Sequence, residues 1–281
     1  MPSADSAPHR LLLSTARAAA VSAVAAAVAM IGKARSRRGA TTPRRKGEGD
    51  FVTAIDLQCE RLLRERLLRA VPAAGFVGEE TAVVGVDRDA VWIVDPIDGT
   101  SNFANGLPHW AIAVALLWRG RPVVAATWCE PDGVLYSAVA GHGAFAGKRR
   151  LRVQRGRWDD GSIVGCQWFR GQQDLAFLLA LQRDGARVRT LGSTVVQLID
   201  VARGRLDANV QQQGRIWDFA APALVLLEAG GSFTDWRGRP VFPLANLDTV
   251  GHVATIGAVP GVHARVLRRV RPFAPRAARA R

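Results

Sequence analysis

One stretch constrains this chain more than any other: a short apolar run that stops abruptly at two closely spaced carboxylates. Residues 91–94 are apolar, as a buried strand must be, and Asp95 and Asp98 follow directly. Pro96 fixes its own φ and favours an extended conformation for the residue before it. We therefore expect Asp95 at the end of a buried strand and Asp98 in the turn beyond it.

Two carboxylates on a stiff turn beside a buried strand are costly unless something neutralises them. A hard divalent cation such as Mg²⁺ would do so, because it binds carboxylate, carbonyl, hydroxyl and phosphate oxygens. Thr100 supplies a hydroxyl in the same turn, and Gly99 lets the backbone approach a ligand closely. The alternative is a solvated surface loop, but such a loop needs no apolar strand leading into it. The stretch therefore predicts a metal site.

The composition is that of a globular protein with a strong basic excess. The 281 residues are 48% hydrophobic and 22% charged, and the formal net charge is +14. Residues 33–46 and 265–281 carry much of this charge, which suits phosphate esters but also nucleic acid or an acidic membrane surface. No nucleic-acid motif accompanies it, so we expect neither a dedicated nucleic-acid partner nor a membrane partner.

Cysteine usage and the N-terminal segment favour a cytoplasmic location. Cys59, Cys129 and Cys166 are scattered without a C-x-x-C pair, which indicates neither a zinc site nor a disulfide framework. Residues 18–32 are apolar but too short to span a bilayer, and the basic residues 33–38 that follow are unlike the end of a signal peptide. This segment predicts a first helix packed on the domain, with secretion as the alternative.

The remaining elements follow from apolar periodicity and turn residues. Asp56 is expected to cap a helix over 57–71 whose solvent face carries a Glu60–Arg64 pair, and 75–78 is expected to be a strand leading into Glu79 and Glu80. An antiparallel meander is predicted over 110–118, 122–129, 134–139 and 144–145. Beyond residue 150 we expect strands at 162–166, 187–190 and 206–210 and helices at 174–182, 194–201 and from Asp218 to Gly230, with Pro222 near the first turn.

Several of these segments match one family in the same order along nearly the whole chain. They are Asp50-Phe51-Val52-Thr53 with Asp56, Gly78-Glu79-Glu80, Asp95-Pro96-Ile97-Asp98-Gly99-Thr100 with Asn102-Phe103, and Trp217-Asp218-Phe219-Ala220 ending in Glu228-Ala229-Gly230-Gly231. On these motifs the chain resembles the inositol monophosphatase family. The resemblance implies an α/β (α+β) fold, a layered α-β-α-β-α sandwich, in a homodimer that hydrolyses small phosphate monoesters with two or three Mg²⁺ ions.

The resemblance also implies roles for individual residues. Glu79, Asp95, the Ile97 carbonyl and the Thr100 hydroxyl would hold one metal, and Asp95, Asp98 and Asp218 a second. Asp56 would pair with Thr100, and Glu79 with Thr100 would orient the attacking water. The amides of Gly99 and Thr100 would bind the phosphate. Two cations stabilise the entering and leaving oxygens of an in-line displacement, so we expect attack by water without a covalent intermediate.

The substrate end departs from the inositol-specific pattern, in which the resemblance places a Glu shortly before Trp-Asp. Here Gln211 and two further glutamines stand in a segment one residue shorter, and Arg215 would favour a second anionic group or solvent. Gly192 and Ser193 could present amides and a hydroxyl to an anion at a helix start, although ordinary capping explains Ser193 equally well. Inositol phosphates, histidinol phosphate, a nucleotide 3′-phosphate and fructose bisphosphate all remain possible substrates.

Two further interpretations stay open. A silent regulatory protein of the same fold should have lost a metal carboxylate, and all four are present; a non-catalytic polyanion-binding protein would use the basic surface instead. In organisation we expect one compact unit, with N-terminal helices and the meander in 1–150 carrying most metal ligands, an α/β half in 151–281 closing the site, and a disordered end over 274–281.

Overall fold

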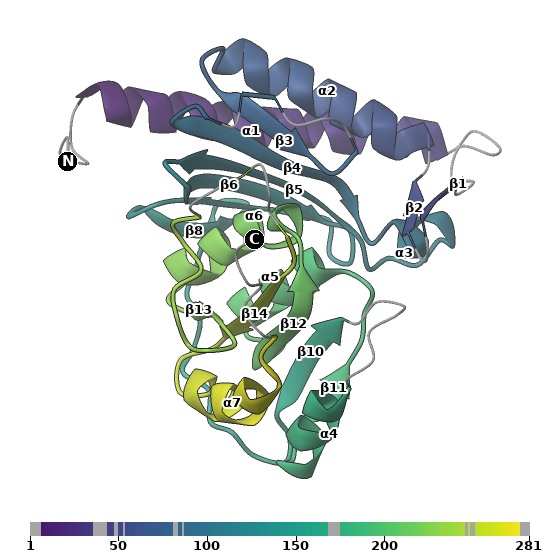
Figure 1. The fold of residues 1–281 in the computed structure, drawn as a ribbon. Coiled ribbons are helices and arrows are strands. Elements are labelled where there is room, and N and C mark those ends of the chain that lie inside the picture. Colours follow the sequence, from purple (N-terminus) through teal and green to yellow (C-terminus); the bar gives the residue numbers. More distant parts are fainter. Residues whose placement is uncertain are drawn as a thin grey trace, which may run out of the picture.

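The structure is a computed structural model that describes residues 7–35, 44–47, 50–52, 54–80, 84–85, 87–167, 175–244, 247 and 251–275, with the backbone alone for 7–12, 44–47 and 50–52. Figure 1 shows five layers, with helices and sheets alternating from top to bottom. The predicted layered α-β-α-β-α sandwich is thereby confirmed. The disordered end was expected over 274–281, of which 276–281 lie outside the described residues, as do residues 36–43 of the basic segment 33–46. Residues 274–275 are described, and the Pro275 carbonyl accepts a hydrogen bond from Arg237 at 2.7 Å.

The upper sheet has seven strands in the order β3-β4-β5-β6-β7-β8-β9. β3 runs parallel to β4, and every later neighbour is antiparallel, so the predicted meander is present. The short last strand was not expected from the sequence, because its residues Arg149 and Arg150 are exposed and carry no apolar alternation. The strands are β3 (Gly75–Gly78), β4 (Ala90–Asp98), β5 (Ala111–Trp118), β6 (Arg121–Cys129), β7 (Val134–Val139), β8 (Gly143–Ala146) and β9 (Arg149–Leu151).

The lower sheet has five strands in the order β11-β10-β12-β14-β13. β10 pairs in parallel with β11 and β12, while β14 is antiparallel to both of its neighbours. A separate two-stranded ribbon, β1 (Arg44–Gly47) with β2 (Asp50–Val52), stands beside the upper sheet. The strands of the lower sheet are β10 (Ile163–Gln167), β11 (Arg187–Arg189), β12 (Ala208–Gly214), β13 (Ser232–Asp235) and β14 (Val253–Ala258).

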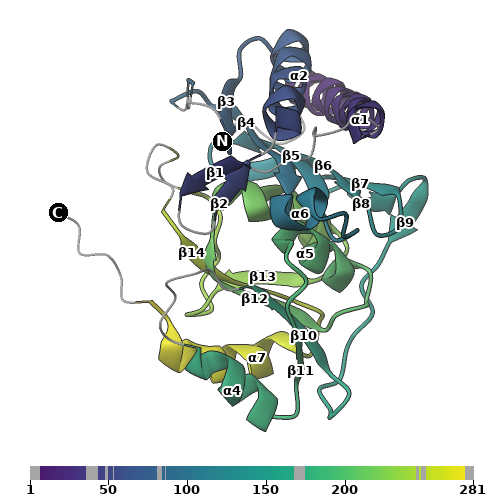
Figure 2. The same cartoon turned by 90° about the vertical axis from the view of Figure 1, so that its right-hand side faces the viewer.

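Helices fill the other three layers. α1 (Ala7–Arg35) and α2 (Ala54–Ala70) cover the outer face of the upper sheet, and their apolar sides form one of two hydrophobic clusters with it. The second cluster surrounds α5 (Thr194–Ala202) and α6 (Ile216–Glu228), which lie between the two sheets (Figure 2). The outer face of the lower sheet carries α4 (Ala176–Arg183), α7 (His263–Val270) and a 3-10 turn (Arg271–Phe273), and the short α3 (Thr100–Ala104) follows β4.

Three predictions from the sequence, on Asp56, Asp218 and Glu60, were wrong. Asp56 is the third residue of α2 and not its cap, because the helix already begins at Ala54. Asp218 is likewise the third residue of α6, which places Pro222 in the second turn, where its missing N–H cannot bond the Asp218 carbonyl. Glu60 is fully buried and forms no solvent-exposed pair with Arg64, whose guanidinium lies over the Phe76 ring.

α1 is the one described helix long and apolar enough to cross a membrane by length and composition, over Leu13–Arg35. About one third of that stretch is buried in the protein. Its small and branched side chains, including Ala20, Val24 and Ile31, are fully enclosed against α2 and the upper sheet. The packing agrees with the first helix expected from the sequence, which is longer than predicted.

A carboxylate at the end of α6 joins the middle layer to the upper sheet. Glu228 accepts hydrogen bonds from the backbone N–H groups of Gly141 and Gly143, both at 2.8 Å. These glycines form the turn between β7 and β8. A turn whose free amides converge on one carboxylate gains charge-assisted hydrogen bonds, so this contact fixes the far end of α6 while its near end carries Asp218.

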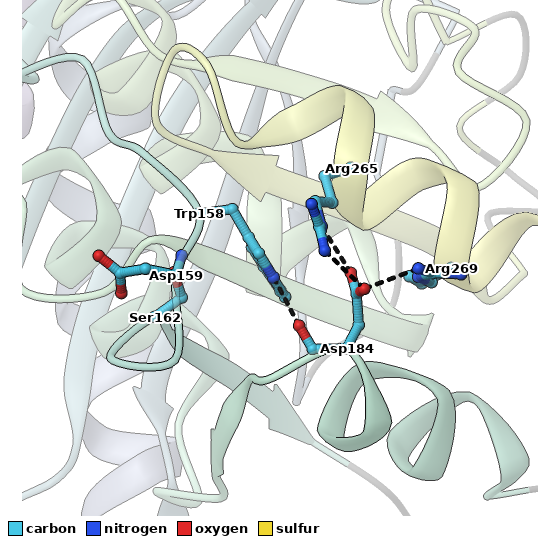
Figure 3. A network of polar contacts seen from close by, with 6 residues as sticks. All are labelled: Trp158, Asp159, Ser162, Asp184, Arg265 and Arg269. Atoms are coloured by element: carbon cyan, nitrogen blue, oxygen red, sulfur yellow. Dashed lines mark hydrogen bonds and ion pairs between the residues drawn. The ribbon is translucent and has the colours of Figure 1, made fainter.

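The two helices outside the lower sheet, α4 and α7, are joined by the carboxylate of Asp184 (Figure 3). Asp184, at the end of α4, accepts two hydrogen bonds at 2.8 Å from Arg265 and one at 2.6 Å from Arg269, both on α7. Its carbonyl accepts from Trp158 Nε1 at 2.7 Å. The hydrogen bonds from the two guanidinium groups hold the pKa of the Asp184 carboxyl well below its usual range.

This arrangement predicts a pH-dependent stability difference for Asp184→Asn. The variant should lose about 1–2 kcal/mol at pH 7, since both arginines are partly exposed and screened. A carboxyl whose folded-state pKa is depressed stabilises the fold above its unfolded pKa of about 4 and loses this contribution as the pH falls below it. Urea denaturation of wild type and variant should therefore converge toward acid pH.

Asp160→Asn, an exposed acid in the nearby turn, serves as the matched control and should be neutral. An equal loss of stability at neutral and at acid pH would show that lost packing, and not charge, accounts for the Asp184 effect.

Candidate active site

The site is built where β4 leaves the upper sheet. Asp95 still pairs with Ala113 of β5, but the register then shifts so that Asp98 lies opposite Ala111. Pro96 lies inside this irregular segment, where a residue without an N–H is tolerated. Gly99 then has φ = 91°, and a β-carbon there would lie 2.8 Å from the His109 carbonyl oxygen, so the turn into α3 requires glycine.

Three carboxylates meet at this point, two from β4 of the upper sheet and one from α6 of the helical layer beneath it. Asp95, Asp98 and Asp218 each place an oxygen within 4.8 Å of the others. Asp95 is fully buried, whereas Asp98 and Asp218 retain some exposure. Asp218 comes from the first turn of α6, where its carboxylate accepts a hydrogen bond from the backbone N–H of Arg215 at 2.8 Å. Glu79, just beyond β3, forms a side-chain hydrogen bond with Asp95.

The electrostatics of the cluster favour a cation. Burial, followed by the charges of Glu79, Asp98 and Asp218, raises the pKa of Asp95 well above its usual value. Asp95 Oδ1 is buried and has no hydrogen-bond partner. Such an arrangement penalises the ionised form unless positive charge is supplied, and three carboxylates at this spacing are the oxygen ligands that a hard divalent ion takes. The residues therefore fit a Mg²⁺-type ion.

Asp98 is held by the N-terminal turn of α5. Its Oδ2 accepts from the Ser193 hydroxyl and from the Val195 N–H, the latter at 2.7 Å. Ser193 also caps α5, because its Oγ accepts from the Val196 N–H at 3.1 Å. Burial raises the pKa of Asp98 to about 6, and the hydrogen bonds from Ser193, Val195 and Thr194 act in the opposite direction. Ser193 therefore both caps α5 and holds a carboxylate of the site.

Thr100 occupies a second hydrogen-bonded corner. Its hydroxyl lies 3.1 Å from Asp56 Oδ1 and 3.0 Å from the Ile97 carbonyl oxygen. Asp56 is fully buried on α2, so this contact connects the outer helical layer to the end of β4. The structure therefore brings together Asp56, Thr100 and Ile97, which the sequence had placed in one site.

Asn102 joins the site loop to the segment before α5, a part that sequence reasoning did not assign. Its side-chain amide donates to the His109 carbonyl at 2.6 Å and to the Leu191 carbonyl at 2.8 Å. Gly192 follows with φ = 79°, and a β-carbon there would lie 2.5 Å from Asn102 Nδ2. Asn102 belongs to the motif over 95–103, and this is the signal by which sequence reasoning could have found it. The residues whose carbonyls it bonds lie 7 and 89 positions away along the chain.

Gln211 in β12 and Arg215 just after it were expected to bind substrate, and the two side chains lie in different surroundings. Gln211 is fully buried, and neither its amide nitrogen nor its oxygen has a hydrogen-bond partner. Arg215 is half-buried, with its guanidinium 5.9 Å from the centre of the Trp217 ring. The structure places Arg215 next to Asp218 through its backbone, while a substrate role for either side chain stays a prediction.

Comparison with known proteins gives one consistent result. The sequence model of the inositol monophosphatase family matches residues 12–271. An inositol-1-monophosphatase of Rhizobium meliloti is 40% identical over 199 residues, which are 69% of this chain and 75% of that protein. A protein of Escherichia coli named Nus factor SuhB is 32% identical over 246 residues, or 85% of this chain and 92% of that protein.

Solved structures agree with the sequence matches. The inositol monophosphatase of Anabaena superposes with a TM-score of 0.80 at 25% identity, covering 94% of this chain and 97% of that one. SuhB of Mycobacterium tuberculosis superposes with a TM-score of 0.74 at 29% identity, covering 96% and 98%.

Crowding of buried like charges predicts that Asp95→Asn stabilises the protein in the absence of metal. The amide has nearly the same shape as the carboxylate but removes one charge from the cluster, so the free energy of unfolding in EDTA at neutral pH should rise by roughly 1–3 kcal/mol. Thermal denaturation with and without Mg²⁺ measures this, and the variant should also lose the stabilisation that Mg²⁺ gives to wild type.

Asp207→Asn provides the comparison, because that carboxylate lies outside the cluster and accepts from the Ile163 N–H at 2.8 Å. It should keep the Mg²⁺ response of wild type. A lower melting temperature for Asp95→Asn in EDTA would show that the carboxylates do not repel one another as the geometry implies.

Proposed function

This chain belongs to the inositol monophosphatase family and is a phosphomonoesterase, and we propose that it hydrolyses a small, inositol-phosphate-like monoester with Mg²⁺. The observation that supports the proposal most is the meeting of Asp95, Asp98 and Asp218 within 4.8 Å, with Glu79 bonded to Asp95. These four acids come from three places in the chain: the end of β3, the end of β4 and the first turn of α6. Bringing buried like charges together costs stability, so their convergence supports a role in binding a cation.

Glu79, Asp95, the Ile97 carbonyl and Thr100 would hold one ion, and Asp95, Asp98 and Asp218 a second. When bound, the ions would supply positive charge to the phosphate and lower the pKa of a coordinated water. The protein's own contribution is to hold these oxygens in place before substrate arrives, through the N–H groups of Val195 and Arg215 that donate to Asp98 and Asp218.

Thr100 and Asp56 would set the direction of the nucleophile. Because the Thr100 hydroxyl donates to the buried Asp56 carboxylate, Thr100 Oγ1 could take a proton from a water lying against Glu79 while its own proton passes to Asp56. The Glu79 carboxylate would orient the same water. Backbone N–H groups of Gly99 and Thr100 would bind the phosphate as negative charge shifts to its leaving oxygen.

For the rest of the substrate, Gly192, Ser193, Gln211 and Arg215 remain the proposed contacts. An amide at Gln211 can bond sugar hydroxyls, whereas Arg215 would prefer a second anionic group. Histidinol phosphate, a nucleotide 3′-phosphate and fructose bisphosphate are therefore alternatives on the same chemistry. The homodimer implied by the resemblance stays a prediction, as does the cytoplasmic location indicated by the cysteines and the N-terminal segment.

A polyanion-binding function is the competing proposal of another class. The net charge of +14 supports it, and relatives of this chain bear the name Nus factor SuhB. It predicts nucleic-acid binding that weakens steeply with salt and survives Asp95→Asn. The phosphatase proposal instead predicts that Asp95→Asn abolishes Mg²⁺-dependent phosphate release, because that activity needs the carboxylate cluster.

Phosphate release by the full chain tests the proposal. We expect release from at least one of inositol 1-phosphate, histidinol phosphate, 3′-AMP and fructose 1,6-bisphosphate, dependent on Mg²⁺, inhibited by Li⁺ and lost in Asp95→Asn. In ¹⁸O-water the label should enter free phosphate without a trapped phospho-enzyme. Release without added metal, or a phospho-enzyme, would contradict the mechanism.

The Thr100 corner gives a separate prediction. Thr100→Val keeps the shape but removes the hydroxyl, and kcat should fall by about 10²-fold, as for the loss of a proton-transfer partner. Thr100→Ser restores the hydroxyl and should retain most of the activity. Steady-state kinetics at saturating Mg²⁺ measures both; a Thr100→Val enzyme as active as Thr100→Ser would remove the hydroxyl from the mechanism.

A further inference from the structure

A further acidic residue, Glu60, lies next to the candidate site. Glu60 is in the middle of α2, its side chain is fully buried, and its Oε2 accepts a hydrogen bond from the backbone N–H of Glu80 at 2.8 Å. Its Oε1 is buried and has no hydrogen-bond partner. Burying a carboxylate costs free energy that one hydrogen bond does not offset, so this residue type calls for an explanation.

The strand opposite makes room for this carboxylate. A β-carbon on Gly78 would lie 2.7 Å from Glu60 Oε1 and closer still to Cδ and Oε2. Gly78 does not have a left-handed φ, so its backbone would accept another residue. Glycine is therefore needed here by the Glu60 side chain, and not by the turn itself.

The contact fixes the residue between Gly78 and Glu80. The Glu79 N–H donates to the Val94 carbonyl at 3.2 Å on β4, and the next N–H, that of Glu80, donates to Glu60. Both peptide groups that flank the Glu79 α-carbon are thus anchored, one to the sheet and one to α2. The Glu79 carboxylate then extends to its hydrogen bond with Asp95.

We propose that Glu60 is a positioning residue for the metal site, acting through the Glu80 N–H to hold Glu79 toward Asp95. Its function is as a hydrogen-bond acceptor of fixed geometry. The negative charge is not needed for this function, because a neutral amide oxygen can accept the same N–H. The inference rests on the proposed Mg²⁺-dependent function.

The test compares three single variants in the full chain. Glu60→Ala removes the acceptor and should raise the Mg²⁺ concentration for half-maximal thermal stabilisation by about 10–100-fold, the usual effect of losing a partner behind a metal ligand. Glu60→Gln keeps an acceptor oxygen and should stay within about threefold of wild type. Glu65→Ala, on the exposed face of the same helix, is the matched control and should not change the midpoint.

A second route disturbs the contact while leaving Glu60 in place. In Gly78→Ala the added β-carbon must displace the end of the Glu60 side chain, so the Mg²⁺ midpoint should rise as in Glu60→Ala. In the double variant Glu60→Ala/Gly78→Ala the methyl group has free space, and the effect should not exceed that of Glu60→Ala alone. This non-additivity is expected only if both changes act through one contact.

The outcomes separate the inference from the proposed function. If wild type shows neither Mg²⁺-dependent stabilisation nor phosphate release, the proposed function fails. If wild type responds and Glu60→Ala keeps its midpoint while only its metal-free melting temperature falls, Glu60 is merely structural and the inference is overturned. A Glu60→Gln variant as impaired as Glu60→Ala would also overturn it, because charge and not the acceptor would then matter. If Glu60→Ala does not fold, an unchanged midpoint in Gly78→Ala overturns the inference.

Discussion

The architecture depends on holding together acids that repel one another. Asp95, Asp98 and Asp218 lie within 4.8 Å in a largely buried position, where neighbouring charge and desolvation both oppose ionisation. Two of them are held by backbone donors from elsewhere in the chain: the first turn of α5 donates to Asp98, and the backbone before α6 donates to Asp218. Asp95 is held by its place in β4, where it pairs with Ala113, and the charge of Glu79 opposes its ionisation. The protein thus holds a cluster of carboxylates that a bound cation would stabilise.

The layers explain how so many donors can converge. α5 and α6 lie between the two sheets and send their N-terminal turns to the point where β4 leaves the upper sheet. Their opposite ends are also fixed, as the contact of Glu228 with the β7–β8 turn shows for α6. From the other side α2 contributes Asp56 and Glu60. The site is therefore a junction of three layers, and its geometry is as rigid as their packing.

Sequence reasoning located the elements well where apolar runs and turn residues alternate, as in the meander from β5 to β8. It erred where side-chain direction depends on a neighbour in space. Glu60 was expected on the solvent-exposed face of α2 beside Arg64. Its carboxylate is instead buried in the protein interior, where Gly78 of the adjacent strand leaves room for it. The helix starts at Asp56 and Asp218 were also misplaced. The Asp56 carboxylate accepts from the Thr100 hydroxyl of the site, and the Asp218 carboxylate accepts from the Arg215 N–H at the start of its own helix while lying in the cluster.

The residue types at the site and their order can be read without a structure, because a buried strand ending in Asp-Pro-Ile-Asp-Gly-Thr is typical of few other sites. The alternation of helices and strands can be read in the same way, since both depend on periodicities within a single segment. Contacts in space had to be seen in the folded chain: which oxygens meet, that Ser193 donates to Asp98 as well as capping α5, and that Glu60 bonds the residue after Glu79. The contacts of Glu60 with Glu80 and of Ser193 with Asp98 join residues 20 and 95 positions apart, and a hydrogen bond between such residues is specified by packing and not by local pattern.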